Sequence, residues 1–203
     1  ALDIYPYDFF KNPKLAKNNI EYVSWFSNAF ARKTINAGLA TYIPGHYHDL
    51  PILIDDFHDY DAMCAVVSPM DEHGWFSFGT EGSVTEALLR KSKHIFLEVN
   101  PNMPRCLHGP AVHISRVSAL CESNYPMVAL PAAQLDEKST IIGNLIAEEI
   151  PNGACLQLGI GAIPDAVGAA LKGKCNLGIH TEMLTSSMVD LIECGAVDNS
   201  RKQ

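Results

Sequence analysis

The chain has 203 residues, 47% hydrophobic and 19% charged, a composition typical of globular domains long enough to bury a core. Its net charge of −8 and the lack of any basic run argue against a protein that binds nucleic acids by charge attraction. No apolar stretch approaches the roughly 20 residues that a membrane-spanning helix needs. The first ten residues lack the basic start and apolar segment of a signal peptide.

Helices and strands are expected to alternate along the first part of the chain. Residues 1–19 mix aromatic residues with Lys and Asn and are expected to wrap over a surface. Apolar residues at helical spacing predict an amphipathic helix over 20–37, with Gly38 after it. Apolar runs bounded by turn residues predict the remaining elements: strands over 39–43, 62–67, 94–99 and 112–117, a helical turn over 50–57, and a helix over 84–92.

The second part of the chain predicts a helix over 140–150 followed by a β-α-β unit. An apolar strand over 154–158 meets the break Gly159-Ile160-Gly161, and Pro164 and Asp165 suit the first turn of a helix that ends at Gly173. A second strand over 177–180 precedes Glu182, and Thr185 or Ser186 can cap a helix over 188–194. Open α/β sheets bind ligands at the carboxyl ends of their strands, so this stretch is the candidate site.

Two other groups of polar residues have both a chemical and a structural interpretation. Asp71, Glu72 and His73 lie in a loop over 68–79 and could act as acids and bases, but adjacent residues rarely converge on one atom. A structural loop or hairpin is therefore the favoured interpretation. His46 and His48 are spaced like metal ligands, alone or with His73 in a metal hydrolase, but no third ligand follows at a natural spacing. We expect no metal site.

The six cysteines show no C-x-x-C spacing and lie mostly in apolar segments. Free cysteines in apolar segments behave as small hydrophobic residues in reducing compartments. We therefore expect buried, reduced thiols in a cytoplasmic protein.

Residues 133–137 resemble a connector between two α/β domains, one over 1–132 and one over 138–203. The second sheet would be small if it stopped at the last predicted helix. We therefore expect the second domain to be truncated and the chain to be a fragment of a longer protein.

Three blocks of sequence resemble the acetyl-CoA hydrolase/transferase family, also called family I CoA-transferases. They are SPMDEHGWFSFG at 68–79, VNPNMPR at 99–105, and LQLGIGAIPDAV at 156–167 together with GIHTEM at 178–183. The similarity runs from about residue 20 to the end and is greatest to 4-hydroxybutyrate and acetate/butyrate CoA-transferases. It implies an α/β fold of open, mainly parallel sheets flanked by helices, like NagB and the CoA-transferases. Family members are roughly twice as long, which implies an N-terminal portion.

The resemblance also assigns roles to individual residues. The family's catalytic glutamate falls on Glu182, and its CoA-binding glycine loop falls on Gly159, Ile160, Gly161, Ala162 and Ile163. The implied reaction moves CoA between an acyl-CoA and a small carboxylate through a glutamyl-CoA thioester, with CoA as a substrate and no permanently bound cofactor. It also implies a homo-oligomer.

Two alternatives remain open at this point. Water can take the place of the acceptor carboxylate, which would make the protein an acyl-CoA hydrolase that uses the same glutamate. The chain can also be a folded α/β fragment that binds CoA weakly, or supports an interface, without turnover.

Overall fold

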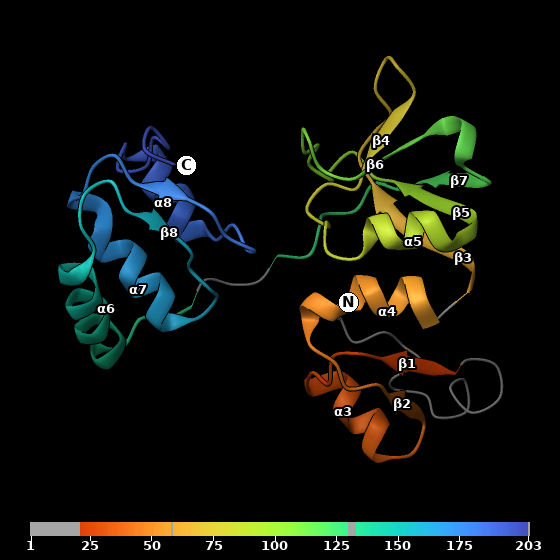
Figure 1. Cartoon of the computed structure of the whole chain (residues 1–203), viewed down its shortest axis with the longest axis horizontal. Helices are drawn as coiled ribbons and strands as arrows, with labels where there is room; N and C mark the ends of the chain where they lie inside the picture. Colours follow the sequence, from red (N-terminus) through yellow and green to blue (C-terminus); the bar gives the residue numbers. More distant parts are fainter. Residues whose placement is uncertain (1–20, 58, 130–132, 203) are drawn as a thin grey trace. The chain divides into compact units, whose positions relative to one another are not determined.

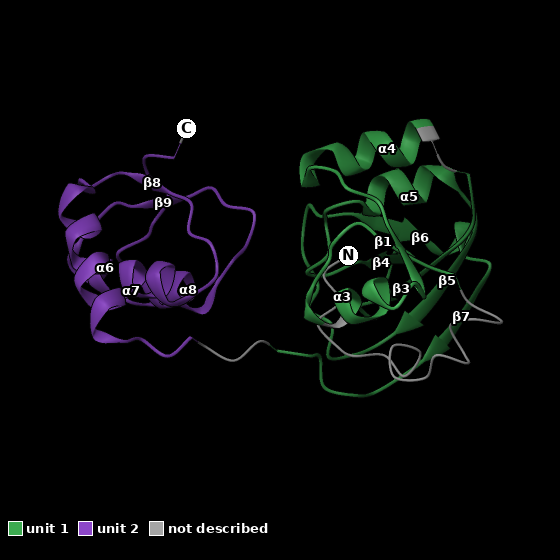
Figure 2. Cartoon of the chain, turned by 90° about the horizontal axis from the view of Figure 1, so that it is seen from below, with its two compact units in different colours: residues 1–129 green, residues 130–203 purple. Residues whose placement is uncertain are grey.

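The computed structural model describes residues 21–57, 59–129 and 133–202. The chain divides into two compact units, residues 1–129 (unit 1) and 130–203 (unit 2), which are coloured separately in Figure 2. The predicted wrapping segment at 1–19 lies outside the described residues. The division falls slightly before the predicted boundary at 132, and each unit has a buried hydrophobic cluster of its own.

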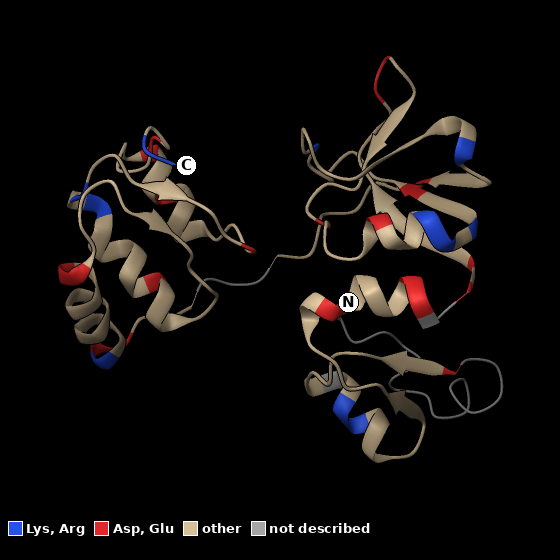
Figure 3. Ribbon diagram, viewed as in Figure 1, with Lys and Arg blue, Asp and Glu red and all other residues tan. Residues whose placement is uncertain are grey.

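Unit 1 is built on a three-stranded parallel sheet (Figure 1). Its strands are β3 (Tyr60–Val67), β5 (Ser92–Val99) and β7 (Ala119–Glu122), in the order β3-β5-β7. Helix α5 (Thr85–Lys91) leads directly into β5, and α4 (Leu50–Phe57) packs against α5. Figure 3 shows acidic positions on α4 and basic positions on α5, and Arg90 donates to Asp55 at 2.7 Å between them.

A short antiparallel pair completes this core. Strand β4 (Trp75–Ser77) pairs with β6 (Ala111–His113), so the predicted loop over 68–79 contains part of a two-stranded sheet. Side chains from both sheets and from α5 form one buried cluster: Met63, Val67, Phe76, Phe78, Leu89, Ile95, Leu97 and Val112. The parallel architecture expected from the sequence is confirmed, with β4-β6 as the antiparallel exception.

The predicted helix over 20–37 is wrong in its first part. Residues Tyr22–Ser24 form β1, which pairs in parallel with β2 (Ala40–Tyr42), and the helix α3 spans only Ala29–Asn36. The side chain of Asn28 accepts the backbone N–H of Ala31 at 2.8 Å, which starts the helix there. Pairing with β2, distant in the chain, is what places residues 22–24 in a strand.

The predicted strand over 112–117 is also too long. Only Ala111–His113 is a strand, and Ile114–Arg116 form the 3-10 turn η2, started by the His113 ring, whose Nδ1 accepts the N–H of Ser115. Strand β7 then joins the edge of the main sheet, where all four of its residues are exposed. Its lack of a buried face explains why no hydrophobic pattern marked it.

The expectation of buried cysteines is wrong, because all six are free and exposed. Cys64 on β3 lies beside Phe96 on β5, on a face of the sheet that stays exposed within the part of the chain that the structure describes. Cys121 lies on the exposed edge strand β7. An apolar strand is only buried where another layer covers it, which the sequence alone does not reveal.

Unit 2 contains the predicted β-α-β arrangement. Helix α6 (Glu137–Glu149) is followed by β8 (Cys155–Leu156), α7 (Ala162–Ala170), the 3-10 turn η3 (Leu171–Gly173), β9 (Gly178–Ile179) and α8 (Ser186–Glu193). Strands β8 and β9 pair in parallel, and Leu177 forms a further parallel bridge to Val197.

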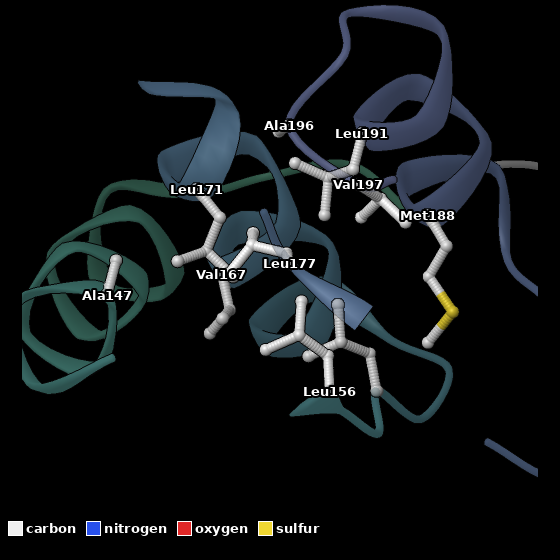
Figure 4. Close-up of a cluster of buried hydrophobic side chains, with 10 residues drawn as sticks. Ala147, Leu156, Val167, Leu171, Leu177, Met188, Leu191, Ala196 and Val197 are labelled. Atoms are coloured by element: carbon white, nitrogen blue, oxygen red, sulfur yellow. The ribbon is translucent and has the colours of Figure 1, made fainter. Parts of the chain in front are cut away.

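The core of unit 2 lies between these helices and the strands (Figure 4). Leu171, Leu177, Met188 and Leu191 are fully buried there. Helix α6 packs on α7 through Gly143, where an added Cβ would lie 2.7 Å from the carbonyl carbon of Ala166. This close approach fixes α7, and therefore the turn before it, against the rest of the unit.

Among the described residues, the longest helix is α6, and none is both long and apolar enough to cross a membrane.

Candidate functional site

The carboxyl ends of β8 and β9 carry the residues that the sequence singled out. Strand β8 leads into the glycine turn at 159–161, and β9 leads into the segment 180–185 before α8. The backbone N–H of His180 donates to the carbonyl of Leu156 at 2.9 Å, which extends the strand pairing to this edge. Both segments therefore lie at the end of a parallel pair, where open α/β sheets place their ligands.

The hydroxyl group of Thr181 ties these two segments together. Its Oγ1 lies 3.3 Å from the carbonyl of Leu158 and 3.1 Å from the carbonyl of Met183. Leu158 precedes the glycine turn, and Met183 follows Glu182. Because a hydroxyl has one proton, Thr181 shares it between these two carbonyls or donates it to one of them, and this partly buried side chain lies between the two backbone segments of the site.

The two glycines of the turn differ in what the backbone requires of them. Gly161 has φ 128° and ψ 174°, a conformation that only glycine adopts without strain. Gly159 has no positive φ, and an added Cβ would meet no atom within 4 Å. The fold requires a glycine at 161, whereas nothing within the described chain requires one at 159.

A pocket of about 740 Å³ opens beside this turn, within unit 2. Two further walls come from the segment before α6 and from the start of α8. The lining residues are Ala133, Leu135, Ile160, Gly161, Asp165, Ala169, Met183, Leu184, Thr185, Ser186, Ser187 and Asp190. Ile160, Leu184 and Leu135 are exposed large hydrophobic side chains, so the pocket has an apolar rim.

Two helices begin at this pocket, and neither has a side-chain cap. Gly161 is at the N-cap position of α7, and Thr185, one of the two residues predicted to cap, is at the N-cap position of α8. The predicted capping bond is absent, because the Thr185 hydroxyl does not bond to the helix backbone. The first N–H groups of a helix carry partial positive charge and have no partner inside the helix. Both helix starts can therefore donate to oxygen atoms of a ligand.

Asp165, in the first turn of α7, joins the two helix starts. Its Oδ1 accepts the Ser187 hydroxyl at 3.0 Å, and Ser187 Oγ lies 2.9 Å from Thr185 Oγ1. Close packing supports this contact, because a Cβ on Gly168 would lie 2.8 Å from Ser187 Cβ. The carboxylate thus has a partner on α8, which the sequence alone did not indicate.

Glu182 lies between β9 and α8 and is exposed. It is not among the residues that line the pocket, although Met183 and Leu184 beside it are. The structure therefore places Ile160, Gly161 and the residues after Glu182 around one space, while Gly159, Ala162, Ile163 and Glu182 itself lie outside its lining.

The loop at 68–79 has a structural role in unit 1. Asp71 accepts the backbone N–H groups of Trp75 at 2.8 Å and His73 at 3.0 Å, and it pairs with Arg105. The Trp75 and His73 N–H groups and the nearby Arg105 hold the pKa of Asp71 below its ordinary value. The Asp71 carboxylate closes the turn and, through Arg105, links the sequence blocks at 68–79 and 99–105. Glu72 and His73 are exposed, with Glu72 Oε1 3.5 Å from His73 Nε2.

The imidazole rings of His46 and His48 stack on each other, with centroids 5.4 Å apart. In the described ranges, no three His, Cys, Asp or Glu side chains are grouped so that they could hold a metal ion.

Sequence reasoning did not select Leu135, Met183, Leu184, Ser187 or Asp190, which line the pocket. Thr185 was considered only as a cap. One signal in the sequence could have indicated these residues. Both α7 and α8 start shortly after paired parallel strands, so their first turns are expected to lie close together at the same edge of the sheet.

Comparison with known proteins agrees with this architecture. A model of the acetyl-CoA hydrolase/transferase N-terminal domain matches residues 5–131. The chain therefore belongs to the acetyl-CoA hydrolase/transferase family.

Two curated relatives extend the similarity into unit 2. A succinyl-CoA:cyclohexane-1-carboxylate CoA transferase of Geobacter metallireducens is 40% identical over 185 residues, which cover 91% of this chain. A butyryl-CoA:acetate CoA-transferase of Anaerostipes caccae is 40% identical over 189 residues, which cover 88% of this chain. The chain spans 42% of the length of each of these relatives.

Solved structures share the fold over nearly the whole chain. RipA from Yersinia pestis is 37% identical with a TM-score of 0.88, over 97% of this chain and 47% of that one. A 4-hydroxybutyrate CoA-transferase from Porphyromonas gingivalis is 30% identical with a TM-score of 0.76, over 97% and 52% of the two chains.

Proposed function

We propose that this chain is part of a CoA-transferase that moves CoA from an acyl-CoA to a small carboxylate. Its membership of the family and the transferase names of its relatives at 40% identity support the reaction class. The observation that carries the proposal within the structure is the pocket at the carboxyl edge of β8 and β9. It has a glycine turn on one side and the residues next to Glu182 on the other.

The proposed nucleophile is Glu182. Its carboxylate oxygen attacks the thioester carbonyl carbon, and the C–S bond of the tetrahedral adduct then breaks. CoA leaves as a thiolate, and the acyl group stays on Glu182 as a mixed acyl-glutamyl anhydride. The thiolate then attacks the glutamyl carbonyl carbon, which releases the first carboxylate and forms the glutamyl-CoA thioester. An incoming carboxylate repeats these steps in reverse, which gives the new acyl-CoA and restores Glu182.

Each step passes through a tetrahedral oxyanion, which hydrogen-bond donors stabilise. Residues at the uncapped starts of α7 and α8 line the pocket, and backbone N–H groups at a helix start are donors of the kind that stabilises an oxyanion. Gly159 allows a ligand to approach the backbone without a side chain in the way.

Because Glu182 is exposed, this mechanism needs more of the protein than the present chain. A glutamyl thioester open to water would hydrolyse, and a solvated carboxylate is a poor nucleophile. The relatives are more than twice as long as the region they share with this chain. We propose that the remaining polypeptide covers Glu182 and completes the CoA site.

Replacing the proposed nucleophile in the full-length enzyme tests its role. Glu182→Gln keeps the size of the side chain but removes the carboxylate, so kcat for transfer from butyryl-CoA to acetate should fall at least about a thousandfold. Glu193→Gln is the matched control, because Glu193 is an exposed carboxylate at the end of α8 and does not line the pocket. A Glu182→Gln enzyme with normal kcat would exclude Glu182 as the nucleophile.

The same assay separates transfer from hydrolysis. An enzyme that releases CoA equally fast with and without acetate would be an acyl-CoA hydrolase. We expect release to require the acceptor carboxylate.

We also propose that the full-length protein is a cytoplasmic homo-oligomer. Light scattering on the purified protein measures its mass in solution, and a monomer at assay concentration would contradict the oligomer.

A further inference from the structure

The wall of the pocket formed by Asp165, Ser187 and Thr185 has a defined hydrogen-bond direction. A carboxylate only accepts hydrogen bonds, so the Ser187 hydroxyl donates its one proton to Asp165 at 3.0 Å. Ser187 Oγ then has only lone pairs left for Thr185 Oγ1, 2.9 Å away. The Thr185 hydroxyl must therefore donate to Ser187.

With the hydrogen bonds running from Thr185 to Ser187 to Asp165, the side chains of this wall have acceptors, and no hydroxyl proton, left for a ligand. The free lone pairs belong to Thr185 Oγ1 and to the second oxygen of Asp165. Asp190 adds another carboxylate to the lining, with Lys172 donating to its Oδ2 at 2.8 Å. Among the described residues that line this pocket, none is Lys, Arg or His. A phosphate group would receive backbone N–H donors from the helix starts there, but it would also meet the carboxylates of Asp165 and Asp190 without a lining side-chain cation to balance the charge.

The remaining lining is apolar, from Leu135, Ile160, Met183 and Leu184. The complementary ligand segment is uncharged, mostly aliphatic, and carries a few N–H or O–H donors. The pantetheine arm of CoA fits this description, because its two amide N–H groups and its hydroxyl can donate to these side chains. Its two amide carbonyls can accept from the backbone N–H groups at the starts of α7 and α8, and most of its other atoms are aliphatic. A volume of about 740 Å³ is within the usual range for a pocket that encloses a ligand of this size.

We propose that this pocket binds the pantetheine arm of the acyl-CoA, with Thr185 and Asp165 accepting its N–H or O–H groups and the phosphates held elsewhere. This inference rests on the proposed function and adds which part of the substrate the pocket recognises. Ser187 is a positioning residue here, because it orients the Thr185 hydroxyl through its own bond to Asp165.

Two inhibitors that divide CoA into its parts test the proposal on the full-length protein. S-methylpantetheine carries the arm alone, and adenosine 3′,5′-bisphosphate carries part of the nucleotide half. Thr185→Val removes the acceptor while keeping the shape, so the inhibition constant of S-methylpantetheine should rise about tenfold. The inhibition constant of adenosine 3′,5′-bisphosphate should stay within about twofold of the wild-type value. Thr185→Ser should restore binding of the arm, and Ser200→Ala, on an exposed turn of the same unit, is the control.

The outcomes separate this inference from the proposed function. A Thr185→Val protein that weakens nucleotide binding but not arm binding would overturn the assignment of the pocket. An effect on KM that appears with butyryl-CoA but not with acetyl-CoA would assign the pocket to the acyl chain and also overturn it. Wild-type protein that transfers no CoA would contradict the proposed function instead. The inference about the pocket could still be tested on that protein, because calorimetry measures the affinity for S-methylpantetheine and any loss of affinity in Thr185→Val.

Discussion

At the residue scale, the glycine turn at 159–161 contains one glycine that the backbone conformation requires and one that it does not. Gly161 has a backbone conformation that a side chain strains, whereas Gly159 has an ordinary one with open space around it. From the sequence, both glycines were predicted to let a ligand approach the backbone. The φ angle that distinguishes them is visible only in the structure.

This difference predicts opposite results for two alanine substitutions. Gly161→Ala should lower the free energy of unfolding of unit 2 by about 1 to 3 kcal/mol, because its backbone lies in a glycine-only region. Gly159→Ala should leave stability unchanged, because a Cβ there meets no atom within 4 Å. If Gly159 contacts CoA as proposed, the added methyl group should raise KM for the acyl-CoA in the full-length enzyme. Urea denaturation and steady-state kinetics measure the two effects.

Gly173→Ala is the control for Gly159, since it also meets no atom within 4 Å and has no positive φ. Equal KM values for the Gly159→Ala, Gly173→Ala and wild-type enzymes would remove Gly159 from the binding site.

At the element scale, the packing of α6 on α7 depends on Gly143. Alanine normally favours a helix over glycine by about 1 kcal/mol. Here the added methyl group would lie 2.7 Å from a backbone carbon of Ala166, so either α7 or α6 must move. We expect Gly143→Ala to destabilise unit 2 by about 1 to 3 kcal/mol net.

Asn144→Ala on the exposed face of α6 is the comparison. It should stabilise slightly, by a few tenths of a kcal/mol, through helix propensity alone. Thermal denaturation of both variants distinguishes the contact from the propensity, and a Gly143→Ala protein as stable as Asn144→Ala would show that the helices are not in close contact.

The sequence predicted those elements that carry a local signal. Strand β3 is an apolar run bounded by turn residues. Helix α8 spans Ser186–Glu193, so it starts two residues before the predicted range, and it ends near Gly195, which has φ 80°. The elements that were missed, β1 and β7, are defined by pairing with distant strands. Short, exposed strands carry little hydrophobic pattern, so their place in a sheet is a tertiary property.

The candidate site was predictable in outline for the same reason. The β-α-β order and the carboxyl edge follow from local pattern, and the chemical roles came from family resemblance. The contact between Asp165 and Ser187 joins residues on different helices, and close approach at Gly168 sets its geometry. No spacing in the sequence encodes that contact.

At the scale of the whole molecule, the separate buried clusters predict that the two units unfold independently. Leu171→Ala in unit 2 and Ile95→Ala in unit 1 each empty a buried site and should cost about 2 to 5 kcal/mol. Both tryptophans, Trp25 and Trp75, lie in unit 1, so their fluorescence reports that unit alone.

We therefore expect Ile95→Ala to shift the fluorescence transition in urea and Leu171→Ala to leave it in place. Circular dichroism at the same urea concentrations should show the loss in unit 2. A fluorescence transition that moves equally in both variants would mean that the units unfold as one.

Whether Glu182 forms a glutamyl-CoA thioester is tested most directly by trapping this covalent intermediate on the full-length protein. After incubation with butyryl-CoA, borohydride should reduce the glutamyl-CoA thioester to a primary alcohol and release CoA, and peptide mass spectrometry should locate the altered residue at Glu182. An altered glutamate outside these 203 residues would contradict the role of Glu182. A protein that transfers CoA with no altered glutamate anywhere would contradict the covalent mechanism itself.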